Sequence, residues 1–416
     1  MENITKSVKS LIRNYPNNFE NIPSPCYVLE EEKFERNLQL LSSVQERSGA
    51  KILIALKGYA LWRSFDLAKQ YLSGVTASGI YEARLGYEEF GKEVTVFSPA
   101  YKLEEMQELV QISNHIIFNS FRQWQKFKGL IDAQNALRER KGIPPIEVGL
   151  RVNPKYSEVS PAIYNPCVQG SRLGITPKAF KKGVKKFGLE GISGLHFHTH
   201  CEQNSDALKR TLKHFTKHFG EYIVGMRWIN FGGGHHITRK DYDVELLIKI
   251  IKKFKKTYAV DVYLEPGEAV GWQCGFLIGS VIDIVKNGVD IAILDVSAAA
   301  HMPDCLEMPY RPDVRNSYMA EAVKKNHKLK LKGEQPYNYR LGGPTCLAGD
   351  VIGDYGFEAP LAIGDRLIFE DMVHYTIVKN NTFNGIPLPS IGMLRKNGTF
   401  ELFKSYSYED YKHRNS

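Results

Sequence analysis

Short apolar runs alternate with amphipathic stretches between residues 51 and 266. The runs have the length of buried strands, and the stretches between them carry apolar residues at helical spacing. The runs cover residues 51–56, 74–77, 93–97, 115–118, 147–152, 191–198, 227–231 and 262–265, with helical patterns over 80–90, 103–112, 120–138 and 244–256 among those between them. This α/β alternation predicts a parallel (β/α)8 barrel of the TIM type, with a doubly wound sheet as the main alternative.

After residue 266 the pattern changes to strands with little helix between them. These predicted strands cover residues 275–285, 291–296, 328–332, 337–341 and 366–369, and glycine-containing turns separate them. We therefore predict an antiparallel β domain. The apolar run 26–29 is not needed by the barrel and could cross to this domain. The prediction is a barrel over 30–270 and a discontinuous β domain over 271–416 together with 1–29.

Composition and charge narrow the class of protein. Hydrophobic residues make up 43% and charged residues 24% of the chain, which is typical of a globular protein. The net charge is +9, but the lysines fall largely in runs typical of solvated helix faces, without interleaved aromatics, so nucleic acid is not expected as a partner. No stretch is long enough for a membrane span, and the polar N-terminus has no signal-peptide core. We expect a cytoplasmic protein without a membrane partner.

The six cysteines are widely spread and form no CxxC pair, so neither a disulfide framework nor a zinc knuckle is indicated. Cys346 lies in the turn Gly343-Pro344-Thr345-Cys346, where a thiol could donate or accept a proton. An isolated cysteine is more often inert, so the position alone does not decide its role.

Reactive side chains follow several predicted barrel strands, at the end where TIM barrels carry their active sites. Lys57 follows the first strand, where a low-dielectric setting favours the neutral amine that a carbonyl-binding lysine needs. Glu265 ends the last strand, where a carboxylate could hold a proton on a pyridine nitrogen. Taken singly, each could equally be an ordinary polar residue at a strand end.

Two further groups follow the strands between them. His196, His198 and His200 alternate, which would place them on one face of a strand, as metal ligands, as a partner for a cofactor ring or as polar filling. No HExxH or CxxC pattern supports a metal, and none is assigned. Gly232-Gly233-Gly234 follows the seventh strand, where backbone N–H groups could close on a phosphate. Together, a lysine for an aldehyde, glycines for a phosphate, a glutamate for a ring nitrogen and a histidine for a ring predict pyridoxal 5′-phosphate (PLP).

The same residues resemble the fold-type III PLP decarboxylases, the group of ornithine, diaminopimelate and arginine decarboxylases. The resemblance covers nearly the whole chain and is strongest to the branch that acts on carboxynorspermidine and carboxyspermidine. The strings that carry it are Ala55-Leu56-Lys57-Gly58-Tyr59, His196-Phe197-His198-Thr199-His200-Cys201-Glu202, Asn230-Phe231-Gly232-Gly233-Gly234-His235-His236, Glu265-Pro266-Gly267-Glu268-Ala269 and Gly343-Pro344-Thr345-Cys346-Leu347-Ala348-Gly349-Asp350. The resemblance implies an alanine racemase-like fold, a barrel followed by a β-sandwich or β-barrel domain.

The resemblance also implies roles for individual residues. Lys57 would bind the cofactor aldehyde, His198 would stack on the ring and Glu265 would pair with the pyridine nitrogen. Gly232, Gly233, Gly234 and the hydroxyl of Tyr375 would hold the phosphate, and Arg151 would lie near the lysine. Cys346 would reach the active site of the other subunit in a homodimer with shared sites and would protonate the α-carbon of the substrate.

Two departures from the family pattern bear on the substrate. Glu268 stands where many relatives have a phosphate-binding arginine, and Leu347 stands where ornithine and diaminopimelate decarboxylases have an acidic residue that meets the substrate. Both favour a longer, polycationic substrate, a carboxylated polyamine such as carboxynorspermidine. We expect Glu268, Arg311, Asp304 and Asp350 among the residues that bind it.

Three alternatives stay open at this point. A diaminopimelate- or ornithine-type decarboxylase is disfavoured by Leu347. An amino-acid racemase would need a catalytic tyrosine where the chain has Cys346. A PLP-carrier protein of the single-barrel type would lack everything after about residue 270, so the predicted β domain speaks against it.

Overall fold

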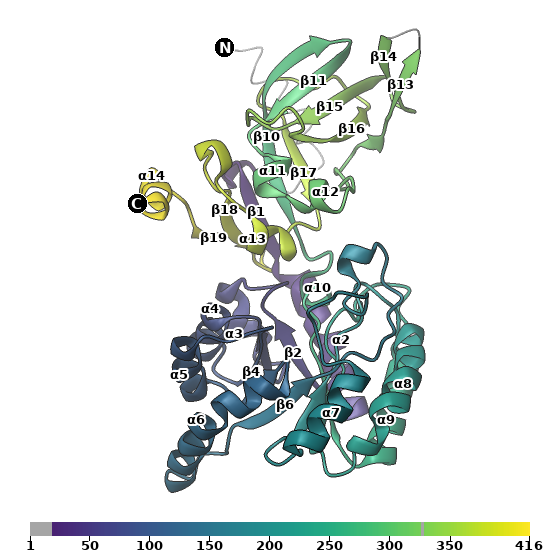
Figure 1. The fold of residues 1–416 in the computed structure, drawn as a ribbon. Coiled ribbons are helices and arrows are strands. Elements are labelled where there is room, and N and C mark those ends of the chain that lie inside the picture. Colours follow the sequence, from purple (N-terminus) through teal and green to yellow (C-terminus); the bar gives the residue numbers. More distant parts are fainter. Residues whose placement is uncertain (1–18, 326–327) are drawn as a thin grey trace. The chain divides into compact units, whose positions relative to one another are not determined.

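The computed structural model describes residues 19–325 and 328–416. The chain divides into two compact units (Figure 1). The barrel unit is Glu35–Val270, and the sheet unit combines Met1–Phe34 with Gly271–Ser416.

The barrel unit contains a closed barrel of parallel strands, as predicted. Each strand pairs with the next, and β9 closes the ring by pairing with β2 at Lys51↔Tyr263 and Ile52↔Leu264. The strands are β2 (Lys51–Ala55), β3 (Gly74–Ala77), β4 (Glu93–Phe97), β5 (His115–Phe118), β6 (Glu147–Arg151), β7 (Gly194–His196), β8 (Trp228–Asn230) and β9 (Asp261–Leu264). Closure brings the ends of all eight strands together, although they are far apart in the sequence.

Helices connect the strands, and α6, α8 and α9 begin at a side chain that caps them. Asp243 accepts a hydrogen bond from the N–H of Leu246 at 2.9 Å, and the same helix ends at the left-handed Ala259. The helices of this part of the chain are α2 (Glu31–Ser48), α3 (Phe65–Ala68), α4 (Ile80–Leu85), α5 (Leu103–Ile112), α6 (Phe121–Arg140), α7 (Pro177–Phe187), α8 (Ser205–Phe219), α9 (Val244–Tyr258) and α10 (Glu268–Gly271). None of the helices within 19–325 and 328–416 is long and apolar enough to cross a membrane.

Strand β7 is shorter than the strand that we predicted from the run 191–198, so the alternating histidines do not share one strand face. The strand ends at His196, and His198 and His200 lie in the segment that follows. The backbone there packs against the glycine segment after β8: a Cβ on Gly232 would lie 2.4 Å from the carbonyl oxygen of Phe197. Since this contact replaces strand pairing, the spacing of two does not set the direction of the later histidines.

The sheet unit is built on a nine-stranded, mostly antiparallel sheet. The early strand β1 (Cys26–Glu30) pairs with β10 and β18, so this run does cross to the later sheet, as predicted. Two pairs in the sheet, β1 with β18 and β11 with β15, are parallel. Its other strands are β10 (Gly275–Asn287), β11 (Val289–Leu294), β12 (Tyr318–Met319), β15 (Tyr337–Gly342), β16 (Val351–Phe357), β17 (Arg366–Glu370), β18 (Ser390–Leu394) and β19 (Phe400–Lys404).

A separate hairpin and four short helices complete this unit. The hairpin is formed by β13 (Glu321–Lys325) and β14 (Lys328–Lys332), and the helices are α11 (Ala298–His301), α12 (Asp304–Glu307), α13 (Tyr375–Lys379) and α14 (Tyr408–Asn415). The hydropathy pattern did not predict β12, β13, β16, β18 or β19. In β16 two glycines and an aspartate interrupt the apolar residues, so the sequence shows no alternation although the strand is almost entirely buried.

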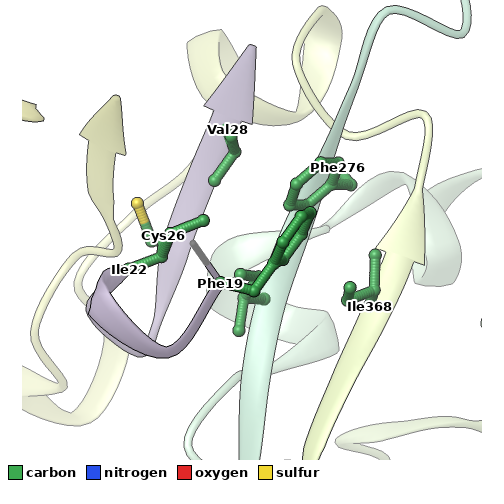
Figure 2. Packing of buried hydrophobic residues seen from close by; sticks show 7 residues of the cluster. Phe19, Ile22, Cys26, Val28, Phe276 and Ile368 are labelled. Carbon is green, nitrogen blue, oxygen red and sulfur yellow. The ribbon is translucent and has the colours of Figure 1, made fainter. Parts of the chain in front are cut away.

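Apolar side chains from distant parts of the chain pack together in the sheet unit. Phe19 and Phe276 stack with ring centroids 5.4 Å apart. Figure 2 shows the cluster, which brings residues 19–28 against strands β10 and β17. Its members are Phe19, Ile22, Cys26, Val28, Phe276, Ile278 and Ile368. Burial of these side chains stabilises the attachment of β1 to the later strands.

A buried histidine lies at the other end of the barrel, where the strands begin. His115 starts β5, is 7% exposed, and stacks on the indole of Trp228 with centroids 5.0 Å apart. Its Nδ1 lies 3.2 Å from Oε1 of Glu93 and 3.3 Å from Oγ1 of Thr95. Burial, followed by the positive charges of Lys51 and Arg227, lowers the pKa of His115 to about 3. The imidazole is therefore neutral in the folded protein near pH 7.

We expect the stability of the protein to fall as pH drops below about 6.5, partly because of His115. In the unfolded chain His115 has an ordinary pKa of about 6.5 and is protonated below that pH. In the folded chain its pKa is about 3, so it stays neutral until the pH falls to about 3. Stability is therefore intact above pH 6.5 and decreases toward pH 3, with a contribution from this group of about 2 kcal/mol between pH 7 and 5. Urea unfolding of wild type and His115→Gln at both pH values measures it. An equal loss of stability in both proteins would contradict the prediction.

Candidate active site

Lys57 lies just beyond β2, where the chain turns at the carboxyl end of the barrel. The N–H groups of Gly58 and Tyr59 both donate to the carbonyl of Ala55, at 2.9 and 3.1 Å. Solvent reaches the Lys57 side chain, yet protein atoms surround its amine on most sides. This desolvation, followed by the Arg151 guanidinium, lowers the pKa of Lys57 and favours the neutral amine. A neutral amine attacks a carbonyl, so the position suits covalent binding of an aldehyde.

Two charged residues of opposite sign adjoin this lysine. Arg151 ends β6, is 6% exposed, and lies over the ring of Phe97 at 4.5 Å. Glu82, in the first turn of α4, accepts a hydrogen bond from the N–H of Ser78 at 2.6 Å and acts electrostatically on Lys57. Burial raises the pKa of Glu82. The Lys57 amine is thus under the influence of a fixed cation and of a carboxylate whose raised pKa favours its protonated form.

Glu265 follows β9 and is held by one side chain from the adjacent strand β8 and one from β7, the strand beyond it. The Asn230 amide donates to Oε1 at 2.7 Å, and His196 Nε2 lies 3.2 Å from Oε2. Burial opposes ionisation of Glu265, but His196 and hydrogen bonds from His196, Asn230 and Thr76 outweigh it, so its pKa lies below the usual range. A buried, oriented carboxylate of this kind can hold a proton on a ring nitrogen placed against it.

His198 is oriented by the glycine segment that follows β8. The N–H of Gly233 donates to His198 Nδ1 at 3.0 Å, so the ring carries its proton on Nε2. Burial, with Lys57 and Arg151 next, holds the pKa of His198 well below its usual value. A neutral imidazole in a fixed orientation can lie flat against an aromatic cofactor ring.

Each residue of the triple glycine is required by a close backbone approach. An added Cβ would lie 2.4 Å from Phe197 O at Gly232, 2.3 Å from Glu265 O at Gly233 and 2.1 Å from His200 O at Gly234. The N–H of Gly232 donates to Asn230 Oδ1 at 2.8 Å. Two of the three N–H groups therefore orient Asn230 and His198, while Gly234 is the partly exposed member of the segment.

These residues fit pyridoxal phosphate in three respects. The desolvated Lys57 amine suits the aldehyde, the Glu265 carboxylate suits the ring nitrogen, and the neutral His198 suits the ring face. His196, His198 and Glu265 also place potential metal ligands within 4.8 Å of one another, so their geometry alone permits a metal ion as well.

A second polar group lies at the same end of the barrel strands. Glu268, the first residue of α10, has Oε2 4.0 Å from Nε2 of the buried His236. Glu202 joins them, with ligand atoms of all three within 4.8 Å. Two carboxylates beside one histidine make this group acidic. The predicted substrate residue Glu268 is thus brought together with two residues that the sequence did not assign.

The remaining predicted residues lie in the sheet unit. Tyr375 begins α13 and is half-buried. Cys346 is exposed, and its N–H donates to Asn384 Oδ1 at 2.9 Å. Asp350 is 4% exposed and accepts hydrogen bonds from Ser297 and from its own turn.

Two further predicted substrate residues of the sheet unit form ion pairs within it. Asp304 pairs with Lys379. The guanidinium of Arg311 donates to the carbonyl of Ala320 at 2.6 Å and pairs with Glu321 at 2.7 Å. Asp304 and Arg311 are therefore each paired with an opposite charge inside the sheet unit.

Sequence reasoning missed Glu82, Asn230 and the role of His196. Glu82 and Asn230 both occupy positions at or just after strand ends, which is the signal that identified Lys57 and Glu265. Asn230 lies two residues before Gly232, the first of the three glycines, and Glu82 lies in the first turn of α4, the helix that follows β3. What the sequence could not show is that Asn230 and His196 both meet Glu265, because this depends on the order of strands around the barrel.

The chain matches the family model of pyridoxal-dependent decarboxylases, C-terminal sheet domain, over residues 26–373. It is 47% identical to carboxynorspermidine/carboxyspermidine decarboxylase of Campylobacter jejuni, over 95% of this chain and 100% of the relative. It is 43% identical to carboxyaminopropylagmatine decarboxylase of Synechocystis, over 95% of this chain and 96% of the relative. The crystal structure of Campylobacter jejuni carboxynorspermidine decarboxylase complexed with norspermidine matches 95% of this chain and 100% of its own, at 46% identity and a TM-score of 0.83.

Proposed function

We propose, given that this chain belongs to the family of pyridoxal-dependent decarboxylases, that it removes CO2 from carboxynorspermidine and carboxyspermidine. The products are norspermidine and spermidine. The observation that carries this proposal is the 47% identity, along the full length of the relative, to an enzyme named for these substrates. Leu347 and Glu268 add support, because each departs from the family pattern toward a longer cationic substrate.

We assign the chemical roles by position at the strand ends. PLP, when bound, withdraws electrons from the α-carbon as its carboxylate leaves. Lys57 holds the cofactor aldehyde, and its lowered pKa favours the neutral amine for exchange with the substrate amine. Glu265 holds the proton on the ring nitrogen, and His198 packs against the ring. Arg151 lowers the pKa of Lys57 through its fixed charge.

Cofactor phosphate binding is assigned to the glycine segment together with Tyr375. Gly232 and Gly233 allow the close backbone approach that shapes this end of the barrel, and Gly234 is the member that solvent reaches. Because Glu268 cannot pair with a phosphate as an arginine would, we assign these contacts to the backbone of the glycine segment and, from the family resemblance, to the Tyr375 hydroxyl. Glu268 then serves the substrate, whose ammonium groups suit the carboxylates of Glu202 and Glu268.

Cys346 is assigned as the acid that delivers a proton to the α-carbon. The thiol is exposed on the surface of the sheet unit, as a group that must reach another surface has to be. We propose that it acts in the active site of the partner in a homodimer with shared sites. A cytoplasmic location and the absence of nucleic-acid or membrane partners stay predictions from the sequence.

A second candidate substrate is carboxyaminopropylagmatine. The 43% identity to the Synechocystis enzyme of that name is nearly as high as the first. The two substrate types differ at the far end, which is a guanidinium in one and an ammonium in the other. We favour the substrate that ends in an ammonium because the higher identity is to the carboxynorspermidine enzyme.

The test is a substrate panel on the purified holoenzyme. We expect kcat/KM for carboxynorspermidine and carboxyspermidine to exceed that for ornithine and diaminopimelate by about 10³-fold or more, since a site built for a long cation leaves polar groups unpaired with a short one. Carboxyaminopropylagmatine should be used less well than either. CO2 release measures each rate. A preference for diaminopimelate or ornithine would overturn the assignment, and a preference for carboxyaminopropylagmatine would establish the second candidate.

A further inference from the structure

We propose that Asp350 and Asn384 are positioning residues that hold the backbone of Cys346 in place so that its thiol meets the α-carbon of the substrate. This inference rests on the proposed role of Cys346 as the proton donor. It concerns contacts inside the sheet unit alone. Asp350 contacts the turn that carries Cys346 at Thr345, and Asn384 contacts it at Cys346 itself.

Asp350 holds the turn through hydrogen bonds from Thr345. Its Oδ2 accepts from the Thr345 hydroxyl at 2.7 Å and from the Thr345 N–H at 3.3 Å. The Ser297 hydroxyl donates to the same carboxylate at 2.8 Å and the Ala299 N–H at 3.2 Å, which ties the turn to the start of α11. Every one of these partners donates, so a group with two acceptor oxygens suits them all.

Gly343 shows how closely the turn is drawn around this carboxylate. A Cβ on Gly343 would lie 2.3 Å from Asp350 Oδ2 and 2.6 Å from its Cγ. Asp350 itself is 4% exposed. The sequence suggested Asp350 as a substrate residue, but a buried carboxylate with four donors around it is suited to hold the turn rather than to bind a cation.

Asn384, from another segment of the chain, holds Cys346 through a second contact, a hydrogen bond from its backbone N–H. Its Oδ1 accepts from the Cys346 N–H at 2.9 Å, and its own backbone is left-handed, with φ 60° and ψ 9°. Asparagine is among the few side-chain-bearing residues that tolerate this conformation. The conformation and the side-chain acceptor are therefore both reasons for asparagine at this position.

The segment that carries Asn384 is itself fixed to α11. The Asn381 N–H donates to the carbonyl of Ala300 at 2.9 Å, and its side-chain amide donates to the carbonyl of Ala299 at 3.0 Å. The Ala299 N–H also donates to Asp350, so the start of α11 contacts both Asp350 and the segment that carries Asn384. The result is a closed set of contacts around Cys346, formed by residues 297–300, 343–350 and 381–384.

Within this frame the thiol differs from the other cysteines of the sheet unit. Cys26, Cys274 and Cys305 are buried, and burial raises the pKa of each. Cys346 is exposed although its backbone N–H is hydrogen bonded. A rigid backbone with a projecting side chain is the arrangement that a residue acting on a separate surface requires.

The chemistry supplies a readout that general stability does not affect. After loss of CO2, a proton delivered to the α-carbon gives the amine product. If the proton were delivered to bound PLP instead, hydrolysis would release the decarboxylated substrate as an aldehyde and leave its nitrogen behind on the cofactor. The ratio of aldehyde to amine therefore reports whether the thiol is in place, independently of how much enzyme is folded.

The decisive variant is Asn384→Gly, which keeps the left-handed backbone accessible and removes only the acceptor. We expect kcat to fall by about three- to tenfold with little change in KM, and the aldehyde fraction to rise by a similar factor. Asn384→Asp retains an acceptor oxygen and should restore both values. Asn316→Gly, at another exposed asparagine with positive φ in the same unit, is the matched control and should leave both unchanged.

Hydrogen exchange of the Cys346 amide gives a readout without turnover. In Asn384→Gly, with or without PLP, this amide should exchange faster by about three- to tenfold, since its acceptor is gone. Thr345→Val removes the hydroxyl that donates to Asp350, so it tests that contact in the same way. It also gives a second result if Asn384→Gly does not fold. Unchanged aldehyde fraction and amide exchange in the folded variants would overturn the proposal.

Cys346→Ala separates this inference from the proposal beneath it. If that variant forms no more aldehyde than wild type, Cys346 is not the proton donor and the proposed role fails. If it forms aldehyde while Asn384→Gly and Thr345→Val do not, Cys346 keeps its role and the positioning inference alone is wrong. A rise in all three variants, reversed in Asn384→Asp, supports both.

Discussion

Replacing Lys57 with alanine is expected to abolish decarboxylation and to release PLP on dialysis. The amine is the one group assigned to hold the cofactor covalently, and it also hands the cofactor to the substrate. Its removal takes away both steps, so kcat should fall by at least about 10⁴-fold, the upper end of what a single acid–base group contributes. Wild-type protein should be yellow, with the visible absorbance band of a lysine-bound cofactor, and the variant should lose that band.

The control for this experiment is Lys182→Ala, on the exposed side of α7 in the same unit. It removes the same number of side-chain atoms without touching the strand ends, so colour and activity should stay at wild-type values. If Lys57→Ala keeps the band after dialysis, the cofactor is anchored elsewhere and the assignment of Lys57 is wrong.

Mixing two inactive variants is expected to restore activity if active sites are shared between subunits. Lys57→Ala and Cys346→Ala each remove one part of the site, and we expect each to be reduced by about 10²-fold or more. In a mixed dimer, one of the two sites receives an intact lysine from one chain and an intact cysteine from the other. With random exchange, half of the dimers are mixed and half of their sites are intact, so about one quarter of wild-type activity should return.

The double variant Lys57→Ala/Cys346→Ala provides the matched control. Mixed with Lys57→Ala it cannot form an intact site, so no activity should return. Subunit exchange is followed by mass-tagging one of the two chains. If tagged and untagged chains form mixed dimers but activity stays at the level of the single variants, each site is contained in one chain and the shared-site proposal fails.

Much of the barrel could be predicted because each unit carries its own signal. The run 51–56 and its seven counterparts have the length of buried strands, and helical patterns lie between them. The carboxyl ends of parallel strands in a closed barrel must meet, so Lys57, His198 and Glu265 could be placed at one end before any coordinates were known. The same reasoning failed for strand β16, where Gly353, Asp354 and Gly356 hide a buried strand.

The family and its cofactor could also be recognised from the sequence. The strings around Lys57, Glu265 and Cys346 are local, and local strings survive without knowledge of packing. The departures at Glu268 and Leu347 are local as well, and they favoured a polyamine substrate. The family model and the identity to a carboxynorspermidine/carboxyspermidine decarboxylase agree with that interpretation.

The tertiary structure decided how these groups are oriented and charged. Spacing placed His196, His198 and His200 on one strand face, but β7 ends at His196, and the glycine segment sets the direction of His198. The hydrogen bonds of Asn230 and His196 to Glu265, and the desolvation that lowers the pKa of Lys57, depend on which strands adjoin across the closed barrel.

The Cys346 turn shows the same division. Its sequence marked a cysteine on a turn, whereas its attachment to Asn384 and, through Asp350, to Ser297 joins segments up to 53 residues apart. Strand periods and motifs are properties of neighbouring residues, so the sequence alone determines them. Orientation, burial and pKa arise from residues that meet only when the chain has folded, and for that reason only the tertiary structure could decide them.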